Sequence, residues 1–471
     1  MADSRAINGP PPDVGREVAQ AANAGAIAAP RRALPSTSEV ARRRLALVAL
    51  GALCLTYVGL AVPVAAPGSA VVLATVERSP DWLLGPWRAF GVDGANGALA
   101  GPLFYLGLWI ALLAYVAILA LHRFIGARLA LSVIVALHVL FLLAPPLLSQ
   151  DVFSYISYAR LDVVHHLSPY THSPDDVPGD AAFAFAGSRD ASSVYGPLFT
   201  IATYPLAKLS VPVAFWVLKS VAALASLGVV ALGWTCARRL GRDPVFVALA
   251  VGTNPLILVH VVGGAHNDAL VVLLWLAALL AAIGARERLG GVLSGAATGI
   301  KVSAGLVLPF LFLGARRKAA VVAGALAAAV ATIGISFAAF GFDAFDALSL
   351  IGQNQERTSR WSLPQRTADG VGSLVGASPD TVVHFTRAAF GLALIGVLLV
   401  LLRRVWRAPP GSTYWVTAAG WATLGLLLAS AWLVPWYAIW LLPLAALSES
   451  RRLFAASLAL TAYMLVIAVP I

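Results

Sequence analysis

The sequence contains few charged residues and almost no cysteine. Charged residues make up 12% of the 471 residues, whereas 59% are hydrophobic, and the mean hydropathy is +0.83. This composition excludes an ordinary soluble domain and is typical of a polytopic membrane protein. The two cysteines, Cys54 and Cys236, both lie inside apolar runs, so we expect neither a disulfide framework nor a cysteine metal site.

Motifs for nucleotide and metal chemistry are also missing. No glycine-rich phosphate loop ends in Lys and Ser or Thr, and no Rossmann glycine fingerprint follows a strand. His165, His166 and His172 lack the carboxylate or cysteine partners of a metal site. We therefore expect no cofactor and no obligatory metal. An enzyme that works in the outer loops would need an activated substrate carried by lipid.

The positive charges follow a pattern that sets membrane topology. The formal net charge is +11, and more than half of the 33 Lys and Arg residues fall in seven short clusters between apolar runs. These clusters lie at residues 42–44, 123–128, 238–242, 286–288, 316–318, 403–407 and 451–452. Clusters of this kind mark the cytoplasmic connections of a membrane protein, so nucleic acid is not an expected partner.

We expect an all-α polytopic protein of the cell membrane, with the lipid bilayer as its constant partner. Residues 1–41 are rich in Pro, Ala and Arg and are expected to be a disordered cytoplasmic tail. Residues 42–471 are expected to form one transmembrane domain, with the N-terminus inside and the C-terminus outside. Eleven crossings are predicted, at 45–66, 100–121, 128–148, 212–237, 245–263, 267–285, 319–341, 384–402, 411–431, 434–449 and 453–471.

Two apolar segments do not fit as crossings. Residues 289–314 lie between two basic clusters and are too short to cross twice at 1.5 Å per residue. They are expected to form a re-entrant pair of half-helices that meet in mid-membrane near Lys301, where irregular backbone must line a cavity or pack against protein. Residues 196–210 are expected to be interfacial or re-entrant. Polar loops at 149–195 and 342–383 are expected outside.

Asp151 directly follows the third predicted crossing, at the mouth of the first outside loop. A carboxylate in this place can serve as a catalytic base at the membrane surface. At about 100° per residue, Asp151, Tyr155, Tyr158 and Asp162 share one face of a helix. A helix that lies on the membrane with its polar edge in water would have the same spacing, and both interpretations stay open on the spacing alone.

Polar residues also gather at two turns between apolar segments. His266, Asn267 and Asp268 form an outside turn, and Asp268 begins a helix whose dipole favours a carboxylate there. Lys301, between two apolar half-helices, suits a phosphate. The alternatives are an ordinary polar hairpin at the first turn and a lysine that extends to the interface at the second.

Further candidates lie in or beside the outside loops. Tyr195 closes the first loop, and Arg357 lies in the second, where a positive charge opposes the inside bias and fits either an anion or solvent. Trp436 belongs to an aromatic cluster at the Pro435 turn, which an aromatic belt explains as well as sugar stacking does.

Five short motifs occur in a fixed order along the chain. They are Ser-Gln-Asp-Val-Phe-Ser-Tyr at 149–155, Tyr-Gly-Pro-Leu at 195–198, Gly-Gly-Ala-His-Asn-Asp-Ala-Leu at 263–270, Gly-Ile-Lys-Val at 299–302 and Trp-Leu-Val-Pro-Trp-Tyr at 432–437. Over roughly residues 45–471, the motifs and their placement resemble the actinobacterial polyprenol-phosphate-mannose-dependent α-(1→6)-mannosyltransferases. These are integral membrane glycosyltransferases of the GT-C class, so the resemblance implies the GT-C fold.

The resemblance implies transfer of mannose from a lipid phosphate to a growing mannan or lipoglycan acceptor, such as the lipomannan core of a cell envelope. It also implies that Asp151 is the catalytic acidic residue, that 266–268 is the His-Asn-Asp motif and that Lys301 is the lysine of the re-entrant segment. The catalytic loop follows the third helix here, whereas in the wider class it commonly follows the first.

We therefore expect Asp151 to deprotonate an acceptor hydroxyl on the extracytoplasmic face as this oxygen displaces the lipid phosphate with inversion. Lys301, His266, Arg160 and Arg357 are expected to bind the donor phosphate, although Arg160 lies about 180° around the helix from Asp151. The expected substrate-binding residues are Tyr155, Tyr158, Asp162, Tyr195, Asn267, Asp268 and Trp436. The alternative function is a membrane transporter or a flippase for lipid-linked sugars, because re-entrant half-helices also occur in transporters.

Overall fold

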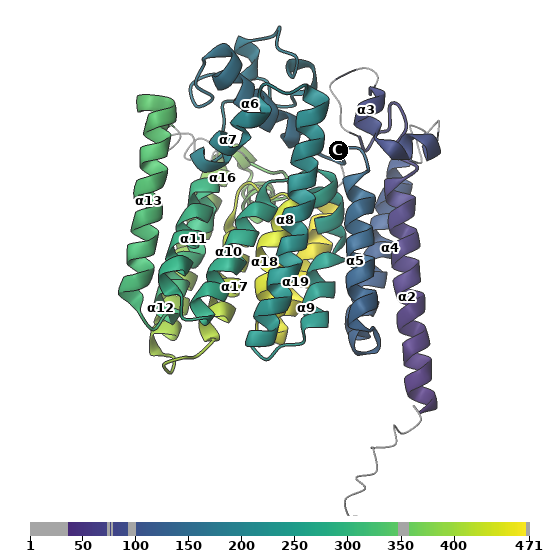
Figure 1. Cartoon of the computed structure of the whole chain (residues 1–471). Coiled ribbons are helices and arrows are strands. Elements are labelled where there is room, and N and C mark those ends of the chain that lie inside the picture. The colour runs from purple at the N-terminus through teal and green to yellow at the C-terminus, as the bar shows by residue number, and fades with distance from the viewer. Residues whose placement is uncertain (1–35, 73–75, 77–78, 93–99, 347–357, 468–471) are drawn as a thin grey trace, which may run out of the picture.

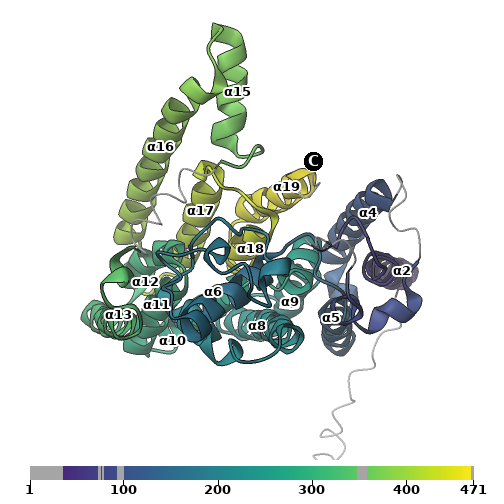
Figure 2. The same ribbon diagram turned by 90° about the horizontal axis from the view of Figure 1, so that it is seen from above.

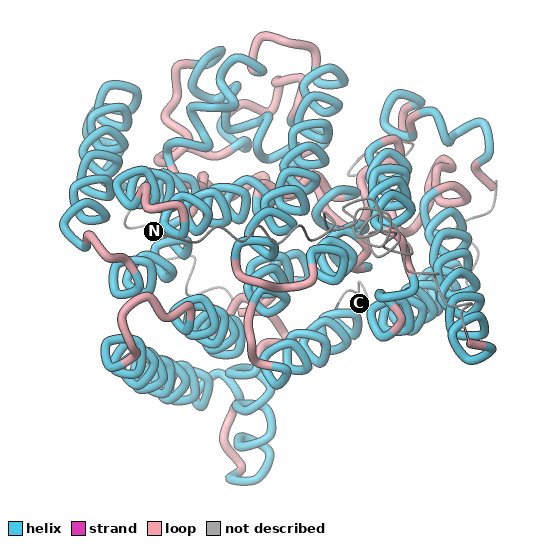
Figure 3. The backbone as a smooth tube through the Cα atoms, turned by 60° about the horizontal axis from the view of Figure 1, so that its bottom comes forward, coloured by secondary structure: helices cyan, strands magenta, loops and turns pink. Residues whose placement is uncertain are grey.

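The structure, a computed structural model, describes residues 36–72, 76, 79–92, 100–346 and 358–467. The regular elements of these residues are all helical, and they form a bundle with an outer layer at one end (Figures 1 and 3). The helices of nine or more residues are α2 (Thr37–Ala61), α4 (Ala100–Ala120), α5 (Ala127–Leu142), α6 (Asp151–His165), α8 (Val211–Arg239), α9 (Pro244–Gly252), α10 (Asp268–Ile283), α11 (Glu287–Ile300), α13 (Lys318–Phe340), α15 (Leu363–Val375), α16 (Pro379–Arg407), α17 (Tyr414–Ala429), α18 (Ala438–Leu447) and α19 (Arg451–Ile467). The shorter ones that matter here are α7 (Pro197–Thr203), η5 (Tyr204–Leu206), η6 (Ile257–Gly263), η7 (Val302–Val307), α12 (Leu308–Gly314) and η9 (Pro435–Tyr437).

Apolar runs form helices because a bilayer requires every backbone group to be bonded within its own segment. Helices with the length and composition to cross a membrane are Thr37–Ala61, Gly101–Ala120, Val211–Arg239, Lys318–Phe345 and Asp380–Arg407. Helices α9 and η6 are separated by a short break and bend by 64° there. If they are counted as one span, they make a sixth helix of this kind. Five more apolar helices have only 10–17 residues, fewer than the about 20 of a straight crossing. Among the described residues, five or six helices are therefore long and apolar enough to span a membrane, and the count of eleven stays a prediction.

The basic clusters gather at one end of the bundle, the lower end in Figure 1. Arg242, between α8 and α9, pairs with Glu449, between α18 and α19. Lys318 at the start of α13 lies 4.6 Å above the ring of Trp406 at the end of α16. These contacts join connections that are far apart in the sequence, so positive charge is concentrated on one side of the bundle.

Residues 289–314 form a hairpin with its turn at Lys301. Helix α11 runs up beside α10, and the chain returns through η7 and α12. The Lys301 Nζ donates to Asp268 at the start of α10, and the carbonyl of Ala304 accepts from Trp275, two turns further along α10. The chain has therefore reversed within three residues, as predicted. The turn is level with the first residue of α10 rather than halfway along that helix.

Residues 149–195, the first loop predicted to lie outside, form the layer over the upper end of the bundle in Figure 1, with α6 near their start. Phe153 of α6 stacks on Phe215 of α8, with ring centroids 5.5 Å and planes 7° apart, and Trp82 packs edge-on against both rings. This aromatic contact fixes α6 to α8, one of the two longest described helices. The predicted interfacial segment, 196–210, contains α7 and η5 in the same layer.

Two segments predicted as a tail and a loop contain helix. Helix α2 begins at Thr37, where Ser36 caps it, so the boundary predicted at residue 42 falls inside the helix. The predicted loop 342–383 contains α15 and the start of α16, which project together from the bundle in Figure 2. Arg357 lies outside the described residues.

Candidate active site

Asp151 is the first residue of α6, and a tight turn holds it there. Its backbone N–H donates to Ser149 Oγ at 3.2 Å. Leu148 has a left-handed φ of 55°, which is uncommon for a branched residue, and its N–H donates to the carbonyl of Val71 at 3.0 Å. The turn redirects the chain between α5 and α6 and leaves the Asp151 side chain 34% exposed.

A buried lysine fixes the segment that leads into this turn. Lys219 of α8 is fully buried, and its Nζ donates to the carbonyls of Phe141, Ala144 and Pro145. The carbonyls at a helix C-terminus have no partners within the helix, so the N–H groups of the Lys219 side chain satisfy that of Phe141 as well as those just beyond the helix. Lys219 therefore anchors the end of α5, from which the chain continues to Asp151.

The Asp151 carboxylate contacts one tyrosine and one histidine. The Tyr195 hydroxyl donates to its Oδ2 at 3.3 Å, and His266 Nδ1 lies 3.4 Å from the same oxygen. Burial raises the pKa of Asp151, but His266 outweighs this effect together with Lys301 and Tyr195, so the pKa stays below its usual value. Asp151 is therefore a carboxylate at neutral pH and is able to accept a proton.

Lys301 and Asp268 form a second charged pair beside the first. Lys301 Nζ donates to Asp268 Oδ1 at 2.8 Å, and Trp440 Nε1 donates to the same oxygen at 2.7 Å. The Lys301 ammonium also lies 4.7 Å from the centroid of the Tyr437 ring and 5.0 Å from that of Trp440. Asp268 is 1% exposed and Lys301 is 18% exposed, so the lysine presents the accessible charge of this pair.

The turn between η6 and α10 supplies the other predicted residues. His266 is fully buried and stacks on Trp436, with ring centroids 3.8 Å apart and planes 15° apart. The backbone N–H of Asn267 donates to the Tyr155 hydroxyl at 3.4 Å. Both polar atoms of the Asn267 side chain are buried without a partner among the described residues. Ala265, with a φ of 59°, makes the sharp turn that places these side chains under α6.

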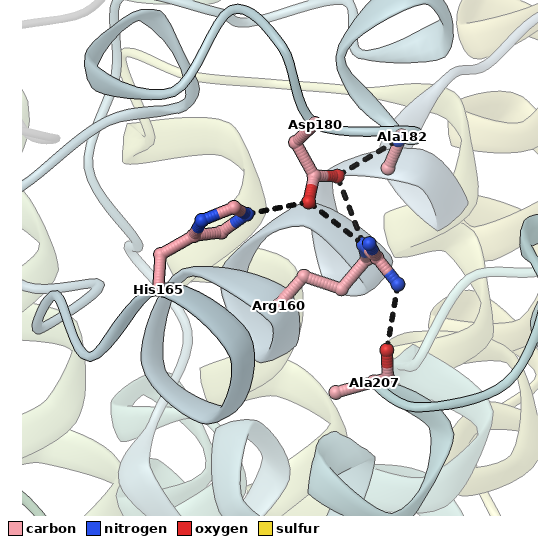
Figure 4. Close-up of polar contacts among 5 residues, drawn as sticks. All are labelled: Arg160, His165, Asp180, Ala182 and Ala207. Atoms are coloured by element: carbon pink, nitrogen blue, oxygen red, sulfur yellow. Dashed lines mark hydrogen bonds and ion pairs between the residues drawn. The ribbon is translucent and has the colours of Figure 1, made fainter.

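Arg160 lies apart from this cluster. Figure 4 shows its guanidinium between Asp180 and the carbonyl of Ala207, at 2.9 Å and 2.7 Å, while His165 Nε2 lies 2.6 Å from Asp180. These partners give Arg160 a structural role in the outer layer, and the donor-phosphate role predicted for it stays a prediction.

Tyr158 and Asp162 also serve the outer layer. The Tyr158 hydroxyl donates to the carbonyl of Ala191 at 2.9 Å, and Asp162 accepts from the Tyr204 hydroxyl at 2.6 Å. The predicted polar face of α6 thus divides along its length. Its first turn, with Asp151 and Tyr155, meets the charged cluster, and its later turns hold the loop.

Replacing Asp180 with Asn is expected to loosen the outer layer. Burial raises the Asp180 pKa, but Arg160, His165 and the Ala182 N–H lower it below its usual value. Because the folded pKa is lowered, the stabilisation is complete above about pH 4 and is lost as the pH falls through the folded pKa. After allowance for partial exposure, we expect a local loss of about 2 kcal/mol, or roughly thirtyfold faster cleavage of the loop in limited proteolysis at neutral pH.

The matched control for this measurement is Asp190→Asn, because Asp190 is an exposed carboxylate of the same loop. Its cleavage rate should equal that of the wild type. Equal rates for Asp180→Asn and Asp190→Asn would show that the Arg160 contact does not hold the layer.

A cavity of about 1150 Å³ opens beside Lys301. Tyr195, Lys301 and Tyr437 are among its lining residues, and Arg387 of α16 adds a second positive charge. Small and apolar residues of α11, α13, α16 and α17 form most of its walls. Its volume exceeds the about 300–1,000 Å³ of pockets for drug-sized ligands, so it offers more space than one sugar ring needs.

Sequence reasoning grouped Tyr437 and Trp440 with Trp436 in one aromatic cluster but predicted a binding role for Trp436 alone. In the structure Trp440 bonds to Asp268, and the rings of Tyr437 and Trp440 both lie against Lys301. The spacing of four residues from Trp436 to Trp440 was the available signal, because it places both rings on one side of a helix. Among the described residues, no group of three His, Cys, Asp or Glu side chains is arranged to hold a metal ion.

Comparison with known families identifies the chain. Residues 43–317 match the family described as alpha-(1->6)-mannopyranosyltransferase, N-terminal domain, and this is more than half of the chain. The chain belongs to this family. The predicted resemblance to these mannosyltransferases is therefore confirmed. The matched residues include Asp151, the turn 266–268 and Lys301.

Three relatives show how far the similarity extends. Alpha-(1->6)-mannopyranosyltransferase A of Mycobacterium tuberculosis is 29% identical over 423 residues, 82% of this chain and 78% of the relative. A probable alpha-(1->6)-mannopyranosyltransferase of Mycolicibacterium smegmatis is 29% identical over 374 residues, 68% of this chain and 65% of the relative. Alpha-(1->6)-mannopyranosyltransferase B of Corynebacterium glutamicum is 28% identical over 360 residues, 66% and 57% of the two chains. No solved structure matches the chain.

Proposed function

We propose that this protein transfers mannose from polyprenyl-phosphate mannose to a mannan or lipoglycan acceptor, forming an α-(1→6) link with inversion. The observation that carries this proposal is a cavity with mostly apolar walls, in which Lys301 and Arg387 supply positive charge. A lipid phosphate has the same two parts, an anionic head and an apolar chain. Family membership supports mannose as the sugar.

The apolar walls suit a lipid donor because they lie at the edge of the bundle. Two of the wall helices, α13 and α16, are the least buried of the long apolar helices. Only 22% of the residues in the apolar stretch of α13 are buried, and only 11% of those in α16. Ile333 and Phe337 of α13 and Leu394 of α16 are among the cavity-lining residues. A polyprenyl chain can enter sideways between such helices while its phosphate reaches Lys301.

Asp151 and Lys301 together suit a displacement at the anomeric carbon. Asp151 accepts the proton of the acceptor 6-hydroxyl as this oxygen forms the new bond to the anomeric carbon. The bond from that carbon to the donor phosphate breaks, and its electron pair moves to the phosphate oxygen, where Lys301 stabilises the charge. Since the pKa of Asp151 is low, the proton moves as the hydroxyl becomes acidic on bond formation.

The placement of charge supports an extracytoplasmic site. The Asp151 cluster lies at the upper end of the bundle in Figure 1, and the basic connections lie at the lower end. Under the positive-inside rule the lower end faces the cytoplasm. A lipid-linked donor fits this side because it needs no cytoplasmic nucleotide sugar.

The test is an assay in proteoliposomes with radiolabelled polyprenyl-phosphate mannose and a short α-(1→6)-mannoside. We expect the label in a longer mannoside whose new bond has the α configuration. Movement of labelled lipid between leaflets without a longer glycan would favour the flippase instead. A new bond of β configuration would rule out inversion of a β-linked donor.

A further inference from the structure

The first outside loop and the hairpin touch through their backbones at one point. The Gly196 N–H donates to the carbonyl of Ile300 at 2.9 Å. Gly196 is the N-cap residue of α7, which begins at Pro197. Ile300 is the last residue of α11. We call this contact the Gly196–Ile300 junction.

Close approach, and not backbone conformation, is the reason for glycine at this junction. Gly196 has φ −66° and ψ 152°, which any residue adopts. A Cβ built on Gly196 would overlap the carbonyl oxygen of Gly299 and lie 2.7 Å from that of Ile300. Carbon-to-oxygen contacts are normally about 3.3–3.6 Å, so a methyl group would force the two backbones apart by on the order of 1 Å.

The junction lies between the two reacting groups. The residue before Gly196 is Tyr195, which donates to Asp151, and the residue after Ile300 is Lys301, which pairs with Asp268. Tyr195, Gly196 and Lys301 line the same cavity. One backbone hydrogen bond therefore connects the segment of Tyr195, which contacts the base Asp151, to the segment that contains the cation Lys301.

We infer that the Gly196–Ile300 junction is a positioning element that sets the distance between Asp151 and Lys301. The inference rests on the proposed function, in which these groups act on the two ends of one displacement. The attacking oxygen, the anomeric carbon and the leaving phosphate must lie in line, and a misplacement of 1 Å can cost about 10²-fold in rate. In this role Gly196 and Gly299 act through their neighbours Tyr195 and Lys301.

The first experiment compares three glycine-to-alanine variants of the full chain in lipid nanodiscs. Gly196→Ala separates the junction, and we expect kcat to fall about 100-fold while the donor KM stays within threefold. Gly305→Ala is the matched control on the same hairpin, because its Cβ would meet Thr298 at an ordinary 3.5 Å, and its kcat should equal that of the wild type. Gly291→Ala controls for instability, since its Cβ would overlap the carbonyl of Val321 and lie 2.9 Å from the backbone nitrogen of Ala325, between α11 and α13 and away from the cavity lining.

A role that is only structural predicts a different result. Gly196→Ala would then resemble Gly291→Ala, with less folded protein and an unchanged kcat per folded molecule. Equal kcat values for Gly196→Ala and Gly305→Ala would overturn the inference.

A rescue experiment tests the other side of the junction. A Cβ on Gly299 would meet Leu198 Cδ1 at 2.7 Å as its nearest neighbour and Thr332 Oγ1 at 3.0 Å, so Gly299→Ala should also lower kcat. Because the obstacle is the end of a side chain, Leu198→Ala in the same molecule should restore most of the lost rate. Failure of the double variant to recover would argue against the junction geometry as the cause.

Failure of the proposed donor can be separated from failure of this inference. If the wild type transfers nothing from polyprenyl-phosphate mannose, the donor is wrong. The variants are then compared by α-(1→6)-mannan content in cells that lack the native enzyme, a readout that requires no assigned donor. Mannan restored by Gly305→Ala but not by Gly196→Ala, at equal protein levels, supports the junction, and equal restoration overturns it.

Discussion

Asp151→Asn is expected to lower the kcat of mannosyl transfer by about 10²–10⁴-fold, the usual contribution of a general base. The amide keeps the shape of the side chain and the backbone bond to Ser149, but it cannot accept the acceptor proton. The donor KM should change little, because Lys301 and the cavity walls are unaffected. The loss should therefore be confined to the chemical step.

The measurement is steady-state transfer per folded molecule, with folding checked by size-exclusion profile and thermal unfolding. Asp190→Asn is the matched control, since it removes an exposed carboxylate from the same outer loop. If Asp151→Asn retained more than a third of the wild-type kcat, Asp151 would not be the base. Equal losses in both variants would instead point to a general effect of charge in the loop.

The helices and the reversal at Lys301 could be predicted because hydropathy and charge are local signals. Basic clusters on both sides of residues 289–314 require both ends on the same side, and so few residues cannot cross twice. The meeting of Asp151 with His266 and Lys301 is different, because these residues lie on three separate elements. Resemblance to a family grouped them, and the structure then placed Asp151 3.4 Å from His266.

Contacts that depend on packing between distant segments could not be predicted from the sequence. The partner of Arg160 is Asp180, which lies in an irregular stretch without periodicity that could reveal the pairing. The bond from Trp440 to Asp268 requires the register of α18 against α10, which no local pattern encodes. Side-chain spacing thus identified a polar face on α6, but not where that face changes from the reacting groups to the supports of the outer layer.

Lys301→Met is expected to weaken donor binding and to lower kcat by about 10²–10³-fold, the usual effect of removing one preorganised group that stabilises a developing anion. Lys301 is the more exposed partner of its pair with Asp268, and it lines the cavity. The substitution also leaves Asp268, 1% exposed, without its cation, and breaking a buried pair costs about 3–5 kcal/mol. The amount of folded protein should therefore fall as well.

A double variant separates these two effects. Lys301→Met with Asp268→Asn removes both charges, so the folded amount and the unfolding temperature should recover while transfer stays low. Lys318→Met is the control for loss of a positive charge, because Lys318 lies at the opposite end of the bundle against Trp406. Direct binding of polyprenyl phosphate should weaken in both Lys301 variants and remain normal in Lys318→Met. If the double variant recovered transfer together with folding, Lys301 would serve only to neutralise Asp268, and another cation would have to hold the phosphate.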